Sequence, residues 1–122
     1  MNIKRFFFIA AVVAAFSLAL AACGGGTSAP EPLNITIHAR DIAFDVTAID
    51  AKVNQTVNVT YINDGALEHT FLIDNMVAEQ KVAVGQTITF SFTPSAAGTF
   101  QYYCNVPGHK EALMVGTLTV AP

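Results

Sequence analysis

Three side chains that bind soft or borderline metal ions lie at even spacing near the end of the 122-residue chain. They are Cys104, His109 and Met114, in the segment CNVPGHKEALM, and they read as C-x4-H-x4-M. A thiolate, an imidazole and a thioether form a donor set that copper accepts in both of its common oxidation states, whereas hard cations prefer oxygen. The spacing therefore predicts a copper site on this segment.

A second histidine is needed, because an electron-transfer copper site has two histidines and a cysteine in a plane with a weak axial methionine. Of the three histidines in the chain, His38 and His69 remain. His69 follows a glycine-containing loop and begins an apolar run, which predicts a place at the edge of the fold, opposite the loop 104–114. His38 lies on the polar face of a predicted strand, where a solvent-facing role is expected.

The elements that must position these ligands are predicted to be β-strands. Alternation is clearest in 87–93, where Ile88, Phe90 and Phe92 share one face. Similar runs occur at 35–39, 57–61, 98–104 and 117–120, and the parity of 98–104 predicts that Cys104 faces inward. Turn signals separate these runs at the spacing of a β-sandwich, and no helical pattern of useful length occurs. The segment 41–52 is ambiguous, with room for one or two further strands.

The N-terminus has the pattern of a secretory signal. A positive start, Met1 to Arg5, precedes an apolar or small stretch from Phe6 to Leu20, and about 15 apolar residues fall short of the roughly 20 of a spanning helix. The following Leu-Ala-Ala-Cys resembles a bacterial lipoprotein signal, in which the cysteine is diacylated. This predicts that residues 1–22 are removed and that Cys23 carries lipid; ordinary cleavage nearby, leaving a free thiol, is the alternative. Either process places the domain outside the cytoplasm.

The predicted mature chain consists of a tether and one domain. Residues 23–32 are rich in glycine, serine, alanine and proline, as in a flexible linker, and residues 33–122 are enough to fold alone. Removal of the signal leaves four basic and nine acidic side chains, a net charge of −5, which argues against nucleic acid as a partner. Exported thiols usually pair. If Cys23 carries lipid, Cys104 has no partner in the chain, and metal ligation would protect it.

Two segments carry a family resemblance, INDGALEHTFLI around His69 and GTFQYYCNVPGHKEALMVGTLTV around 104–114. They resemble the type 1 blue copper proteins, the cupredoxin family that includes azurin, plastocyanin, pseudoazurin and auracyanin. The C-x4-H-x4-M spacing is similar to the auracyanin pattern rather than to the azurin one. The resemblance covers nearly all of 33–122 and implies a Greek-key β-sandwich.

The resemblance also implies a function and a set of ligands. One copper ion is expected, with His69, Cys104 and His109 as equatorial ligands and Met114 as the axial one. The implied protein is a monomeric electron carrier between membrane-associated redox partners, such as membrane oxidoreductases or cytochromes. In the family the second ligand histidine emerges through an apolar patch where partners dock. The residues expected to form that patch here are His109, Val106, Pro107 and Leu113, with Ala66 and Leu67 nearby.

Three departures from the family pattern affect these expectations. The interval between His69 and Cys104 is too short for the helical flap of azurins, which predicts a minimal cupredoxin. Thr70 stands where many members have an asparagine that braces the ligand loop, so the reduction potential stays open. Glu68 stands where azurin has a glycine whose carbonyl approaches copper, so no fifth ligand is expected.

Two other functional classes compete with an electron carrier. A copper carrier or chaperone outside the cytoplasm would use the same residue types from exposed, exchangeable positions. A nucleophilic enzyme would need a third group to orient a Cys104–His109 pair, and none is evident. A site with four ligands leaves no open position for substrate, so the chain is expected not to be an enzyme. Met76, outside the motif, is expected to pack in a loop or at a rim.

Overall fold

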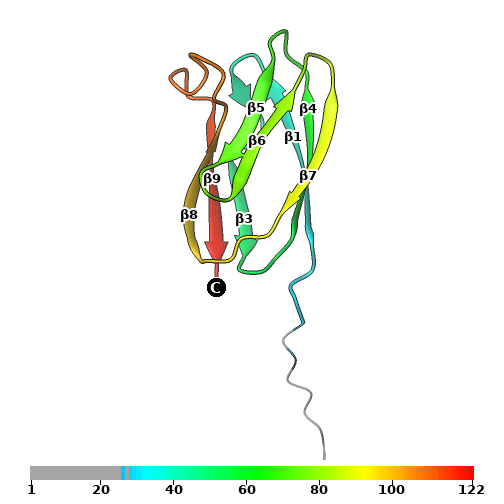
Figure 1. Cartoon of the computed structure of the whole chain (residues 1–122), viewed down its shortest axis with the longest axis vertical. Coiled ribbons are helices and arrows are strands. Elements are labelled where there is room, and N and C mark those ends of the chain that lie inside the picture. The colour runs from blue at the N-terminus through cyan, green and yellow to red at the C-terminus, as the bar shows by residue number, and fades with distance from the viewer. Residues whose placement is uncertain (1–25, 27) are drawn as a thin grey trace, which may run out of the picture.

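Two β-sheets packed face to face make up the computed structural model, which describes residues 26 and 28–122 (Figure 1). No helix occurs in this part of the chain. The strands are β1 (Leu33–Arg40), β2 (Ala43–Phe44), β3 (Ala48–Lys52), β4 (Val57–Asn63), β5 (His69–Ile73), β6 (Val77–Val82), β7 (Thr87–Phe92), β8 (Gly98–Tyr103) and β9 (Val115–Ala121).

The strand order is that of a Greek-key sandwich. One sheet has the order β2-β1-β4-β7 and the other β3-β9-β8-β5-β6. The pairs β1–β4 and β3–β9 are parallel, and the remaining pairs are antiparallel. The prediction of an all-β sandwich without a helical flap is confirmed. The ambiguous segment 41–52 contains two strands, β2 and β3.

Aromatic rings fill the space between the sheets. Tyr61, Phe71 and Tyr102 are fully buried, and the rings of Phe71 and Tyr102 stack with centroids 5.1 Å apart. Such a pair contributes about 0.5–1.5 kcal/mol beyond the area it buries. A Cβ at residue 116 would lie 2.0 Å from the Tyr102 ring. The glycine at position 116 of β9 therefore leaves the space that the Tyr102 ring occupies. The core beneath the loop 104–114 is therefore closely packed.

The two ends of the sandwich differ. The loop that follows β8 lies at one end, and the chain before β1 leaves at the other end, where the C-terminus also lies (Figure 1). At that second end Gln55 Nε2 donates a hydrogen bond to the Glu31 carbonyl at 2.8 Å. Among the described residues no helix is long and apolar enough to cross a membrane. The predicted signal 1–22 and Cys23 lie outside the described residues.

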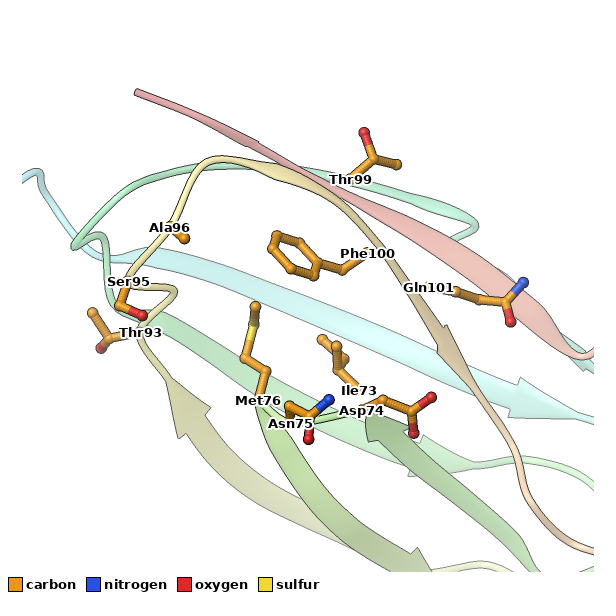
Figure 2. Close-up of a pocket in the computed structure, with 10 residues that line it drawn as sticks. All are labelled: Ile73, Asp74, Asn75, Met76, Thr93, Ser95, Ala96, Thr99, Phe100 and Gln101. Carbon is orange, nitrogen blue, oxygen red and sulfur yellow. The ribbon is translucent and has the colours of Figure 1, made fainter.

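Met76 lies in a pocket of about 540 Å³ between the β5–β6 turn and the β7–β8 loop (Figure 2). Its side chain points toward Phe100, and both pack against the core. No histidine or cysteine lines this pocket. Met76 therefore has the packing position expected of it.

Candidate metal centre

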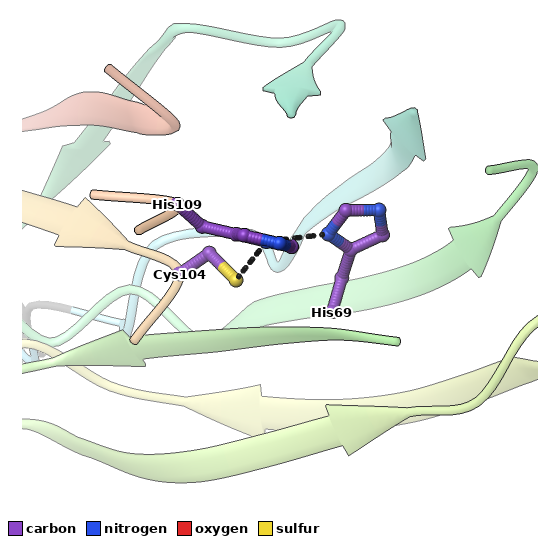
Figure 3. A group of neighbouring side chains, drawn as sticks. All are labelled: His69, Cys104 and His109. Atoms are coloured by element: carbon purple, nitrogen blue, oxygen red, sulfur yellow. Dashed lines mark hydrogen bonds between the residues drawn. The ribbon is translucent and has the colours of Figure 1, made fainter. Parts of the chain in front are cut away.

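Three predicted ligands converge at the loop end of the sandwich (Figure 3). His69 is the first residue of β5, Cys104 directly follows β8, and His109 lies in the loop between β8 and β9. Their potential ligand atoms all lie within 4.8 Å of one another. The three residues are 0%, 0% and 5% exposed, respectively, so the donors face one another away from water.

The distances between the donors fit a single metal ion. His109 Nδ1 lies 3.2 Å from His69 Nδ1 and 3.4 Å from Cys104 Sγ. A first-row ion bound by nitrogen at about 2.0–2.1 Å and by thiolate at about 2.3 Å spans such separations. Two imidazoles and a thiolate are also the equatorial donor set of an electron-transfer copper site. The residues present therefore fit a copper ion in both distance and chemistry.

Met114 is tied to two of these residues through its backbone. Its N–H donates to the His109 carbonyl at 3.0 Å, and its own carbonyl accepts the Cys104 N–H at 3.1 Å. The preceding Leu113 has a left-handed φ of 70° and is 78% exposed, whereas Met114 is fully buried. The left-handed residue reverses the chain, so that one side chain faces solvent and the next faces the interior.

The sulfur of Cys104 receives a hydrogen bond from β5. The Thr70 backbone N–H points at Sγ from 3.3 Å. A donor directed at sulfur stabilises the charged thiolate form that binds metals. Tyr61, on the opposite sheet, donates its hydroxyl to the Thr70 carbonyl at 3.1 Å and so fixes this part of β5. Burial first, and the neighbouring Cys104 second, raise the pKa of Tyr61, which keeps that hydroxyl protonated as a donor.

Thr70 also braces the loop 104–114, although it stands where many family members have an asparagine. Its hydroxyl accepts the Asn105 N–H at 2.9 Å and donates to Asn105 Oδ1 at 2.7 Å. Asn105 Nδ2 in turn donates to Glu79 on β6 at 2.7 Å. The brace is present with the asparagine on the loop instead of the strand. Sequence reasoning missed Asn105 and Glu79, although the position directly after the cysteine was a usable signal for Asn105.

The far side of the His69 ring faces a carboxylate. Asp41 Oδ1 lies 3.7 Å from His69 Nε2, and Nε2 is buried without a hydrogen-bond partner. Burial first and the neighbouring His109 second lower the pKa of His69, with Asp41 acting in the opposite direction. The neutral form is the one that ligates metals. Asp41 was also missed by sequence reasoning.

The other residues considered from the sequence lie around this centre or away from it. His38 is on the outer side of β1, where its Nδ1 bonds the Asp64 carboxylate. The Glu68 side chain pairs with Lys81 Nζ at 3.2 Å. Leu67 is 45% exposed. Of the other residues in the expected docking patch, Pro107 and Ala66 are exposed and Val106 is half-buried.

The comparisons with known proteins define the family. The Cupredoxin-like domain family matches residues 7–120, and the chain therefore belongs to it. Auracyanin-A of Chloroflexus aurantiacus is 30% identical over 162 residues, covering 98% of this chain and 99% of that protein. The copper-resistant cuproprotein CopI of Rubrivivax gelatinosus is 29% identical over 99 residues, covering 63% of this chain and 59% of that protein.

Solved auracyanin structures have the same fold. The structure of auracyanin A, described as a "blue" copper protein of the green thermophilic photosynthetic bacterium Chloroflexus aurantiacus, has a TM-score of 0.65 and 30% identity, covering 73% of this chain and 98% of that one. Dithionite-reduced auracyanin from Roseiflexus castenholzii has a TM-score of 0.69 over 76% of this chain and 100% of that one. Its 23% identity supports the fold alone.

Proposed function

We propose that this chain is a mononuclear type 1 copper protein that carries single electrons. His69, Cys104 and His109 would be its equatorial ligands and Met114 its axial ligand. The observation that carries the proposal is the convergence of two imidazoles and one thiol within 4.8 Å in a buried site. The similarity to auracyanin A, described as a "blue" copper protein, supports the same function.

The fold would hold the ligands in an arrangement that suits electron transfer. Copper, when bound, supplies a one-electron Cu(II)/Cu(I) couple. The chain's part is to hold the donors in nearly one arrangement for both states. β5, β8 and the Thr70–Asn105 bonds hold His69 and Cys104, and the Met114 N–H bonds the His109 carbonyl. Burial excludes water from the donors. Four protein ligands leave no position for a substrate, which agrees with a carrier and not an enzyme.

Electrons would enter and leave through the edge of His109, which is the most exposed of the three equatorial ligands at 5%. Leu113 and Leu67 are both exposed and belong to the β8–β9 and β4–β5 loops, which lie at the same end of the sandwich (Figure 1), and they would contact a redox protein. Val106 and Pro107 would extend that surface. Redox partners of this kind include membrane oxidoreductases and cytochromes. The carrier would meet them as a monomer.

The carrier would work outside the cytoplasm, held to a membrane by lipid on Cys23. Residues 28–32 leave the sandwich at the end opposite the ligand loop (Figure 1), so an anchored domain could point its ligand end away from the lipid. Replacing the acceptor, Cys23→Ser, should release the protein from washed membranes. A variant that stays bound through carbonate washing would indicate an uncleaved helix instead of a lipid.

The electron-carrier function is tested by a redox titration of the copper-loaded chain. One equivalent of reductant should bleach the visible colour and one equivalent of oxidant should restore it, with the copper retained through gel filtration in both states. Loss of copper on reduction, or a colour that does not return, would contradict the proposal.

A copper carrier outside the cytoplasm is the second candidate, favoured by the similarity to the copper-resistant cuproprotein CopI. Such a protein must release its ion on demand. The full burial of His69 and Cys104 disfavours rapid exchange. Transfer of copper to a strong chelator within seconds would support the carrier, and transfer over hours would support electron transfer.

A further inference from the structure

Asp41 lies in the turn between β1 and β2, beside the edge of His69 that faces away from the other ligands. Its Oδ1 is 3.7 Å from His69 Nε2, just beyond hydrogen-bond distance. The same oxygen accepts the Ala66 N–H at 2.8 Å, which holds the carboxylate over the ring. His69 Nε2 is buried and has no other polar partner among the described residues. A buried N–H without an acceptor costs free energy, and the Asp41 carboxylate faces this nitrogen at a distance that a small shift would close.

Gly65 gives the carboxylate room to approach the ring. A Cβ at this position would lie 2.4 Å from Asp41 Oδ1 and 3.1 Å from His69 Nε2. The side chain of any other residue would therefore push the carboxylate aside. The space shared by Asp41 and His69 thus depends on a glycine of the β4–β5 loop.

The charge of Asp41 is not neutralised by a nearby cation. Within the described residues, Glu68 pairs with Lys81 and Asp64 pairs with His38, whereas Asp41 forms no ion pair with a lysine or an arginine. Its side chain is 49% exposed, so water screens part of its field without removing it.

We propose that Asp41 is a positioning residue for His69. The Asp41 carboxylate keeps the proton of the His69 ring on Nε2, and it places a negative charge near the metal. A carboxylate beside Nε2 favours the tautomer that carries its proton there, and this leaves the Nδ1 lone pair directed at Cys104 and His109. The negative charge also favours the more positive oxidation state, Cu(II), over Cu(I). The inference rests on the proposed copper function, because His69 must be a ligand for the second effect to occur.

The tautomer can be measured without copper. Nitrogen-15 NMR of the copper-free, full-length protein should show His69 with its proton on Nε2. Asp41→Ala, which removes the acceptor, should reduce the share of that tautomer, whereas Asp41→Asn keeps an acceptor oxygen and should largely preserve it. An unchanged tautomer in Asp41→Ala would overturn the positioning role.

The effect of charge is measured as the reduction potential of the copper-loaded variants. Asp41→Asn should shift the Cu(II)-to-Cu(I) affinity ratio about threefold toward Cu(I), which is a rise of about 28 mV for one electron. Gly65→Ala keeps the charge but displaces it, and should raise the potential in the same direction by a smaller amount. The matched control is Asp64→Asn, which removes a carboxylate at the same end of the domain that bonds His38 instead of a ligand.

The outcomes separate this inference from the function on which it rests. A blue wild type in which Asp41→Asn and Asp64→Asn shift the potential equally would overturn the specific role of Asp41. A wild type that binds copper without a blue colour would overturn the proposed function itself, while the NMR result on the copper-free protein would still decide the positioning role.

Discussion

His38 and His69 each face an aspartate near the same end of the sandwich, but the two pairs differ in burial and in which ring nitrogen meets the carboxylate. The His38 side chain is 32% exposed, and its Nδ1 bonds Asp64. His69 is fully buried, with Nε2 toward Asp41 and Nδ1 toward His109. A carboxylate therefore bonds Nδ1 of the first ring, whereas Nδ1 of the second ring faces the other candidate ligands.

The fold thus distinguishes a candidate ligand from an ordinary surface histidine. Solvent and one aspartate satisfy His38, so nothing else is needed to explain it. His69 brings a polar ring into a buried site where its partners are another imidazole and a thiol, which a protein tolerates when a ligand compensates for the burial. Burial together with an Nδ1 that faces other potential metal ligands is therefore a better guide to a ligand than the presence of a neighbouring carboxylate.

The largest expected effect comes from removing each ring in turn. Loss of a residue that only orients a ligand costs up to about a hundredfold in metal affinity. His69→Ala removes a predicted direct ligand, so it should lower Cu(II) affinity by more than that. His38→Ala should leave the affinity within about twofold. Competition with a chelator of known affinity measures both. Equal losses in the two variants would remove the distinction between the pairs.

An intermediate effect is expected from the axial position. An axial donor gives electron density to the more positive ion, Cu(II), so loss of the weak thioether in Met114→Leu should raise the reduction potential. Met114→Gln supplies a harder amide oxygen that suits Cu(II) better and should lower the potential, each change being about 60 mV or about 1.4 kcal/mol. Met76→Leu is the matched control, since that methionine lines a separate pocket together with Phe100. Voltammetry decides the point: three unchanged potentials would make Met114 a core residue and not a ligand.

The smallest effect concerns acid stability without copper. Burial lowers the pKa of His69 in the folded protein below its ordinary value of 6.5. The unfolded chain therefore binds more protons between the lowered value and 6.5, so stability is lost as the pH falls through that window and saturates below it. Melting curves of the copper-free protein should show this loss in wild type and His38→Ala, and less of it in His69→Ala. Identical pH profiles for all three would show that His69 does not titrate abnormally.

Much of the fold could be predicted from the sequence, because the alternation of apolar and polar residues along a strand follows the alternation of buried and exposed side chains. The run 87–93 predicted β7, and the parity of 98–104 correctly placed Cys104 inward. β6 was not predicted, since Val77–Val82 has buried residues only at its two ends and so lacks alternation. β2 has two residues, too few for any period to be visible.

The residues that surround the candidate site were harder to predict from the sequence than the donor residues themselves. Residue type and spacing, together with the family resemblance, were enough to single out His69, Cys104, His109 and Met114, whose roles as ligands remain predictions. Asp41 and Asn105 carry no such chemical signature. They reach the site because β1 pairs with β4 and because β5 pairs with β8, and these long-range pairings bring distant segments together.

The most direct test of one type 1 site built from these residues is the visible absorption spectrum of the full chain with one Cu(II) bound. An intense thiolate-to-copper charge-transfer band in the red region is predicted for the wild type. Cys104→Ser should abolish the band, whereas His38→Ala should leave it unchanged. A wild type that binds Cu(II) without the band, or a Cys104→Ser variant that keeps it, would contradict the account.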